Sequence, residues 1–108
     1  MNPKSKANIE TKHDYGSTAL HWAAGYGHKA VVAQLLQAKA ENQAKNDYGN
    51  TALHRAAYNG HEGVVEVLLQ AKADTKATNN SGKTPLQYAE QKGKTAVAEL
   101  LKQAQAVQ

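Results

Sequence analysis

Apolar residues recur along the chain in sets with helical spacing. One set forms a single helix face and occurs three times: Val31, Val32, Leu35 and Leu36; Val64, Val65, Leu68 and Leu69; and Ala96, Val97, Leu100 and Leu101. A shorter helical segment that contains Leu and Ala precedes the set at 20–24 and at 53–57. Isolated helices shorter than about 12 residues are marginal in water. The pattern therefore predicts pairs of short helices that stack to bury their shared faces.

The first two of these sets are 33 residues apart, and the sequence around them repeats with the same period. Residues 14–46 align with residues 47–79 at 21 identical positions, and 7–13 align with 40–46, the closing loop of a unit. Each unit of such an array contacts its neighbours, and about three units are needed for stability. We expect one domain over 7–108 and a flexible N-terminal tail over 1–6. The domain is divided into a partial unit at 7–13 and repeats at 14–46, 47–79 and 80–108.

Turn and capping residues occupy matching positions in each unit. Glycines that suit a tight turn are Gly16, Gly49 and Gly82. Threonines able to cap the first helix are Thr18, Thr51 and Thr84, and Pro85 fits the first helical position. Glycines able to end that helix are Gly27, Gly60 and Gly93. Each unit is therefore expected to contain a projecting turn, a capped first helix and a second helix.

The motif Gly-x-Thr-Ala-Leu-His-x-Ala-Ala-x-x-Gly-His-x-x-Val-Val-x-x-Leu-Leu stands at 16–36 and again at 49–69. Together with the period, this motif resembles the ankyrin repeat, and the resemblance covers nearly the whole chain from Ala7. It implies an all-α ankyrin-repeat solenoid of stacked helix-turn-helix units with projecting β-turn or hairpin loops. It also implies a protein-interaction module that binds through the turn tips and the concave face of the first helices.

Three features depart from the family pattern. Ala19 and Ala52 stand where the family usually has Pro, so those helix starts are less restricted. Lys39 and Lys72 replace a Gly after the second helix, where a positive φ costs a side chain roughly 1 kcal/mol. The third unit differs at three positions, with Gln87, Glu90 and Lys94 in place of His, Ala and His. We expect that unit to be a C-terminal cap with polar groups facing water.

The resemblance places candidate partner-binding residues at the turn tips and on the concave face. They are Tyr15, Ser17, Trp22, Tyr26, Asp47, Tyr48, Asn50, Arg55, Tyr58, Asn59, Lys83 and Tyr88. Every aromatic side chain of the protein is among them, and Trp, Tyr and Arg are enriched among binding hot spots. The alternative is that these rings pack across neighbouring first helices only to support the stack.

The recurring histidines invite comparison with a metal site. They are His21, His28, His54 and His61. Equivalent positions in stacked helical units lie about 10 Å apart, whereas the ligands of one zinc ion each lie about 2 Å from it. We therefore expect no metal, and we expect His21 and His54 to bridge the capping Thr of their own helix to nearby backbone. The sequence has no phosphate-binding glycine loop, nucleophile elbow or Cys, so neither catalysis nor a cofactor is predicted.

Composition and charge indicate which kinds of partner are not expected for this protein. No apolar run is long enough to span a bilayer, and the N-terminus lacks a signal-peptide pattern, so we expect a cytoplasmic protein without a membrane partner. The net charge of +4 arises from 13 basic and 9 acidic residues interspersed along the chain. This distribution disfavours nucleic acid, whose binding would be revealed by steep salt dependence.

Two functions remain open from the sequence. The first is a monomeric module that binds a protein of unknown identity. The second is a structural role, either as a spacer fragment of a larger repeat protein or as a scaffold that self-associates end to end.

Overall fold

The computed structural model describes residue 12 and residues 14–106, so the predicted tail and most of the predicted partial unit lie outside the described residues. The described part contains one 3-10 turn, η2 (Asp14–Gly16), and six α-helices. The helices are α2 (Ala19–Gly25), α3 (Lys29–Gln37), α4 (Ala52–Asn59), α5 (Glu62–Gln70), α6 (Pro85–Gln91) and α7 (Thr95–Ala106). No strand occurs in this part of the chain.

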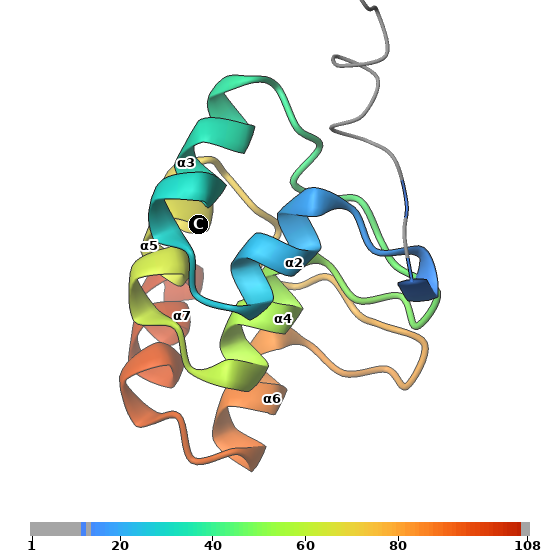
Figure 1. Cartoon of the computed structure of the whole chain (residues 1–108). Coiled ribbons are helices and arrows are strands. Elements are labelled where there is room, and N and C mark those ends of the chain that lie inside the picture. The colour runs from blue at the N-terminus through green and yellow to red at the C-terminus, as the bar shows by residue number, and fades with distance from the viewer. Residues whose placement is uncertain (1–11, 13, 107–108) are drawn as a thin grey trace, which may run out of the picture.

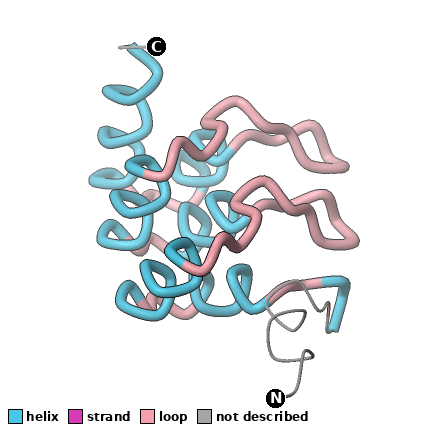
Figure 2. Tube along the Cα trace, turned by 90° about the horizontal axis from the view of Figure 1, so that it is seen from above, coloured by secondary structure: helices cyan, strands magenta, loops and turns pink. Residues whose placement is uncertain are grey.

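The helices form two layers (Figures 1 and 2). The inner layer consists of α2, α4 and α6, which pack side by side in that order, and the outer layer consists of α3, α5 and α7. Within each pair the two helices also contact each other. The predicted all-α solenoid of stacked helix-turn-helix units is thereby confirmed. None of the described helices combines the length and the hydrophobicity that a membrane span requires.

Each inner helix begins at the predicted threonine. The Thr18 side chain accepts a hydrogen bond from the backbone N–H of His21, and the His21 ring in turn accepts one from the Thr18 N–H. Thr51 and His54 form the same reciprocal capping box in α4. Such a cap satisfies amide groups that would otherwise lack a partner in the first turn. In α6 the box is completed by Gln87, and Pro85 is the first helical residue as predicted.

Each outer helix of the first two units ends in a left-handed residue that is not glycine. Lys39 has φ 71° and Lys72 has φ 66°, as the sequence analysis anticipated. The Lys39 N–H donates to Leu36 and the following Ala40 N–H donates to Leu35, which is the hydrogen-bond pattern of a Schellman motif. The motif satisfies the last carbonyls of α3, while the lysine side chain adds backbone strain.

The core lies between the two layers and is built from small and branched apolar side chains. Its largest fully buried apolar residues are Leu20, Leu53, Leu68, Leu101, Val32, Val64, Val65 and Val97. The prediction of one uniform apolar face is wrong for Val31, which is 44% exposed, whereas its repeat equivalent Val64 is 1% exposed. The reason is that α5 packs between α3 and α7, but α3 has a described outer-layer neighbour on one side only.

The loops between units project beyond the inner layer as two long fingers (Figure 2). Their tips, which we call the finger turns, are residues 46–50 and 79–83. In the first finger turn, the Asn46 N–H donates to the Asn50 carbonyl, and Asn46 Oδ1 accepts from the N–H groups of Tyr48 and Asn50. Adjacent turns are joined by bonds from Asp47 N–H to the Tyr15 carbonyl and from Asn80 N–H to the Tyr48 carbonyl. The fingers are therefore tied to one another along the stack.

Candidate protein-binding surface

Three side chains occupy one repeat position on the exposed side of the inner layer. Trp22, Arg55 and Tyr88 lie on α2, α4 and α6, 33 residues apart. In α4 the neighbouring Leu53, His54, Ala56 and Ala57 are fully buried. Helical geometry then directs Arg55 away from the core. Each of the three side chains is half-buried.

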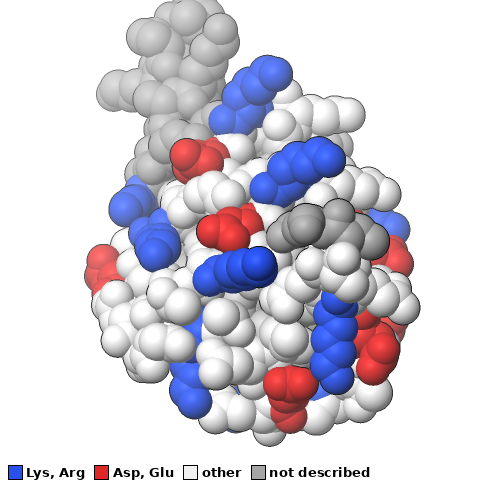
Figure 3. Space-filling model, turned by 180° about the vertical axis from the view of Figure 1, so that it is seen from behind, with Lys and Arg blue, Asp and Glu red and all other residues white. Residues whose placement is uncertain are grey.

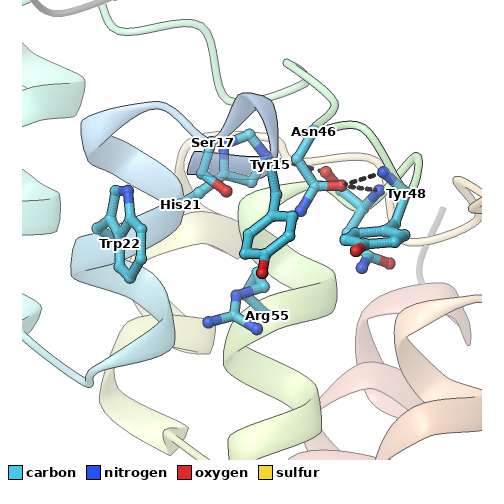
Figure 4. Close-up of a pocket in the computed structure, with 8 residues that line it drawn as sticks. Tyr15, Ser17, His21, Trp22, Asn46, Tyr48 and Arg55 are labelled. Carbon is cyan, nitrogen blue, oxygen red and sulfur yellow. Dashed lines mark hydrogen bonds between the residues drawn. The ribbon is translucent and has the colours of Figure 1, made fainter. Parts of the chain in front are cut away.

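Between the fingers and the inner layer lies an open pocket of about 270 Å³, which we call the finger pocket (Figure 4). Its lining residues come from η2, α2, the first finger turn and α4. They are Tyr15, Ser17, His21, Trp22, Asn46, Tyr48, Asn50 and Arg55. The Tyr15 and Tyr48 rings lie 5.7 Å apart, and the Tyr15 hydroxyl points toward Arg55 (Figure 4). The pocket therefore combines aromatic walls with a guanidinium group.

A second pocket of about 240 Å³ adjoins the first along the inner layer, and we call it the helix pocket. It is lined by Asn50, His54, Arg55, Tyr58 and Tyr88. The Tyr58 and Tyr88 rings meet edge to face at 5.3 Å, and the Tyr88 hydroxyl accepts a hydrogen bond from Asn79 Nδ2 at 2.6 Å. Because both pockets include Asn50 and Arg55, they form one continuous hollow surface.

Arg55 supplies the only charge among the residues that line these two pockets, because neither lining includes Asp, Glu or Lys. Arg is permanently protonated in proteins. Arg55 takes part in no ion pair with the described residues, whereas Lys102 of α7 lies 3.7 Å from Glu90 and 4.0 Å from Glu99. The surface therefore presents a guanidinium without a carboxylate from the described part of the chain.

The remaining predicted contact residues surround the pockets without lining them. The Tyr26 ring stacks on Trp22 at 5.8 Å. Asp47 sits at the finger turn against Gly16. Asn59 Nδ2 donates to the Gly25 carbonyl at 2.9 Å, so its amide already supports the stack. The Lys83 carbonyl accepts from the His54 ring, and its side chain is half-buried.

Some participants were not among the predicted contact residues. His21 and Asn46 line the finger pocket, and Lys92 Nζ lies 4.6 Å from the centre of the Tyr58 ring in a cation–π contact. The involvement of Asn46 could have been predicted from the sequence, because Asn79 stands at the equivalent position 33 residues later. A polar residue before a turn often accepts hydrogen bonds from the backbone two residues on.

Comparison with known proteins adds one finding to this geometry. The family model described as ankyrin repeats, three copies, matches residues 2–79. The chain belongs to the ankyrin-repeat family. No curated protein matches it. The matched range ends before α6 and α7, the ankyrin unit whose sequence departs most from the family motif.

The ankyrin histidines on the inner helices are structural. His21 Nε2 donates to the Asn50 carbonyl at 2.8 Å and His54 Nε2 donates to the Lys83 carbonyl at 2.9 Å, while each Nδ1 accepts from the capping Thr N–H. These bonds confirm the predicted bridge from the capping Thr to nearby backbone, and they link α2 and α4 each to the next finger turn. Burial lowers the pKa of both imidazoles below the usual 6.5, although the carbonyl at Nε2 opposes that shift. Among the described residues, no group of three or more His, Cys, Asp or Glu could hold a metal ion.

Family membership also gives the general class of function. Ankyrin repeats are generally protein-interaction modules, and the family is typically non-enzymatic.

Proposed function

We propose that this ankyrin-repeat domain, residues 7–108, binds a protein partner through the finger turns and the concave face of α2, α4 and α6. The contact residues would be those of the finger pocket and the helix pocket, together with Tyr26, Asp47, Asn59 and Lys83 around them. A standard interface buries about 800 Å² on each partner, so these pockets would form its centre.

The exposure of large aromatic side chains is the observation that supports this proposal most directly. Tyr15, Tyr26, Tyr48 and Tyr58 are 64%, 62%, 55% and 40% exposed. A ring that served only to support the stack would be largely buried between neighbouring units. Tyr88 is closer to that supporting role, because it is half-buried and its hydroxyl is bonded to Asn79. An exposed aromatic cluster beside an Arg has the composition of a binding hot spot.

The size of the pockets favours a protein partner over a small molecule. Pockets that enclose drug-sized ligands typically measure about 300–1,000 Å³. The finger pocket and the helix pocket, at about 270 and 240 Å³, are smaller and open to solvent. Each suits a single protruding side chain of a larger partner.

The test is a cross-linking pull-down with three forms of the chain. The wild type is compared with a variant carrying Trp22→Ala, Tyr48→Ala and Arg55→Ala. A matched control carries Gln34→Ala, Glu66→Ala and Gln70→Ala, which change exposed residues of the outer helices. Circular dichroism confirms that all three are folded.

The proposal requires one protein to be retained by the wild type and the control and lost with the concave-face variant. Equal retention by all three would reject this surface as the binding site.

Self-association is the second candidate function, and the exposure of Val31 on the outer layer favours it. An apolar side chain there could pack against another copy or another repeat. Sedimentation equilibrium tests this hypothesis by comparing the self-association of the wild type with that of Val31→Lys. A concentration-dependent dimer that Val31→Lys abolishes, together with no captured partner, would replace the first proposal with a structural role.

Nucleic-acid binding has less support. Figure 3 shows acidic side chains interspersed among the basic ones on the face turned away from the view of Figure 1. Proteins that bind through phosphates lose affinity steeply as salt rises. Salt-dependent retention of DNA or RNA would be the contrary result.

A further inference from the structure

We propose that the finger pocket is specific for a carboxylate side chain on the partner, an Asp or Glu next to an apolar or aromatic residue, and that Arg55 is the residue that recognises it. This inference rests on the proposed function, because it specifies what the same surface selects.

The first argument is the state of Arg55. Arg55 is half-buried as a residue, lines both pockets, and forms no hydrogen bond or ion pair with the side chains that the structure describes. A partly desolvated charge without a partner is unfavourable. A ligand that supplies a carboxylate removes that cost and gains two parallel N–H···O bonds.

The second argument is the way the fold positions this side chain. Gly25 leaves open the space that the Arg55 guanidinium occupies, since a β-carbon there would lie 2.9 Å from Nη2. The equivalent positions in the neighbouring units carry Trp22 and Tyr88, so one cation is bracketed by aromatic side chains along the stack. Aromatic walls suit an apolar neighbour of the carboxylate, and they lower the local dielectric around the charge pair.

The third argument separates a carboxylate from a phosphate. A phosphorylated side chain carries about −1.5 to −2 charges, and its recognition generally uses a cluster of arginines. The finger pocket and the helix pocket contain one Arg and no Lys. A single guanidinium matches a single carboxylate in charge, and two of its N–H groups can donate to the two carboxylate oxygens.

The acidic residue of the first finger turn does not occupy this position. Asp47 lies at the finger turn against Gly16 and is not a lining residue of either pocket. It also repels a second carboxylate at the rim. A ligand carrying one acidic residue, not an extended acidic run, is therefore the expected match.

The experiment is a selection from phage-displayed random 12-residue peptides on the immobilised wild-type chain, repeated on Arg55→Gln and Arg55→Glu. A tryptophan-free peptide from the wild-type selection is then synthesised in three forms, with Glu, Gln or phosphoserine at its acidic position. Binding is followed by the fluorescence of Trp22, the only tryptophan of the chain and a lining residue of the pocket.

We expect the wild type to enrich peptides with one Asp or Glu, and Arg55→Glu to enrich Lys or Arg in its place. The Gln form should bind the wild type about 10- to 100-fold more weakly than the Glu form, as expected for a hydrogen bond between charged groups. Both forms should bind Arg55→Gln equally weakly. Arg55→Lys should recover only part of the affinity, because it keeps the charge and loses the planar fork.

The contrary outcomes separate the two proposals. Peptides whose binding requires Trp22 but is unchanged by Arg55→Gln would overturn the carboxylate inference and leave concave-face protein binding in place. Equal binding of the Glu and Gln forms of the peptide to the wild type would have the same meaning. Tighter binding of the phosphoserine form would overturn it in favour of phosphate recognition. If neither peptides nor captured proteins require Trp22, Tyr48 or Arg55, both proposals are rejected.

Discussion

The Arg55 guanidinium covers the bare backbone of Gly25, and a β-carbon at Gly25 would lie 2.9 Å from Nη2 and 3.2 Å from Nε of that arginine. Gly25 is the last residue of α2, and its φ is not in the left-handed region. The glycine is therefore needed for the close approach of a side chain from the next unit. Its carbonyl also accepts hydrogen bonds from Asn59 and His61, so one residue of α2 organises three side chains of the following unit.

Replacing Gly25 tests this relationship, and Gly63 provides the matched control. A β-carbon at Gly63 would meet only the flexible end of Lys29, with 3.1 Å to Cδ. Gly63→Ala should raise the free energy of unfolding by about 0.5–1 kcal/mol, because Ala is the better helix former. Gly25→Ala should give a smaller gain or a loss, since the guanidinium must move. Urea denaturation measures both, and equal stabilisation would contradict the proposed crowding.

A double-mutant cycle tests whether Arg55 is the reason that Gly25→Ala is less stable than expected. Gly25→Ala in the background of Arg55→Ala removes the group that the new methyl would displace. Coupling between the two changes should be about 0.5 kcal/mol or more, as is typical of residues in contact. Strict additivity would show that the methyl group clashes with something else.

The stability of the protein should fall as the pH is lowered from 7.5 to 5.5. Burial holds the pKa values of His21 and His54 below 6.5, the ordinary value that applies in the unfolded chain. Below about pH 6.5 the unfolded state therefore binds protons that the folded state does not, and the free energy of unfolding decreases. The contribution of each neutral histidine to stability is complete above that pH and is lost as the pH falls toward the pKa of the folded state. In this range the free energy of unfolding decreases by up to about 1.4 kcal/mol per pH unit for each histidine.

The third unit supplies the control for this pH dependence. Gln87 accepts from the Thr84 N–H with its side-chain oxygen, as His21 and His54 do with Nδ1, but it does not titrate. The double variant His21→Gln, His54→Gln should be less stable at pH 7.5, because two bonds to finger carbonyls are lost, at about 1 kcal/mol each. Its stability should change less between pH 7.5 and 5.5. An unchanged slope in urea titrations would show that other groups cause the effect.

Relieving the left-handed lysines should stabilise the protein. Lys39 and Lys72 have φ values of 71° and 66° at the ends of α3 and α5. Glycine adopts this conformation without the steric cost of a side chain, which is about 1–2 kcal/mol, but it loses more entropy on folding and forfeits a favourable charge at the helix end. We expect a net gain of roughly 0.5–1 kcal/mol for each Lys→Gly change. Thermal melts measure this gain, and Lys76→Gly serves as the control because Lys76 has no positive φ to relieve.

Proline at the start of α4 should also be stabilising. Thr51 has φ −92° and ψ 174°, an extended conformation that a following proline favours, and it matches Thr84 before Pro85 in α6. Ala52→Pro should add about 0.4–1 kcal/mol by restricting the unfolded chain. Ala56→Pro, in the interior of the same helix, should instead unfold it. A loss of stability with Ala52→Pro would mean that the buried site lacks room for the ring.

Much of this fold could be predicted because the repeat fixes it with local signals. The threonine caps, the turn glycines and the positive φ at Lys39 and Lys72 depend on residues within a few positions of one another. The roles of His21 and His54 also followed, because each ring bonds its own capping threonine. Repetition supplied independent copies of every signal.

Contacts between units were harder to predict. Lys45 Nζ donates to the Thr78 carbonyl at 3.1 Å, and Lys12 makes the corresponding bond to Lys45. The contact of Arg55 with Gly25 is of the same kind. Each depends on how far one unit is rotated against the next, which residue spacing does not reveal. The exposure of Val31 likewise reflects which neighbour is present and not the character of the residue.

The hydrogen bonds between units have a further consequence, for the speed of folding. In the described part of the chain they join residues 29 to 36 positions apart, from His21 with Asn50 to Gly25 with His61. No step therefore has to close a loop much longer than one unit, and chains with such local contacts fold rapidly. The unit at 47–79 touches a neighbour on both sides and can act as the nucleus, while the flanking units add to it. Opening should proceed from the outside inward, so amide hydrogens of α4 and α5 should exchange last.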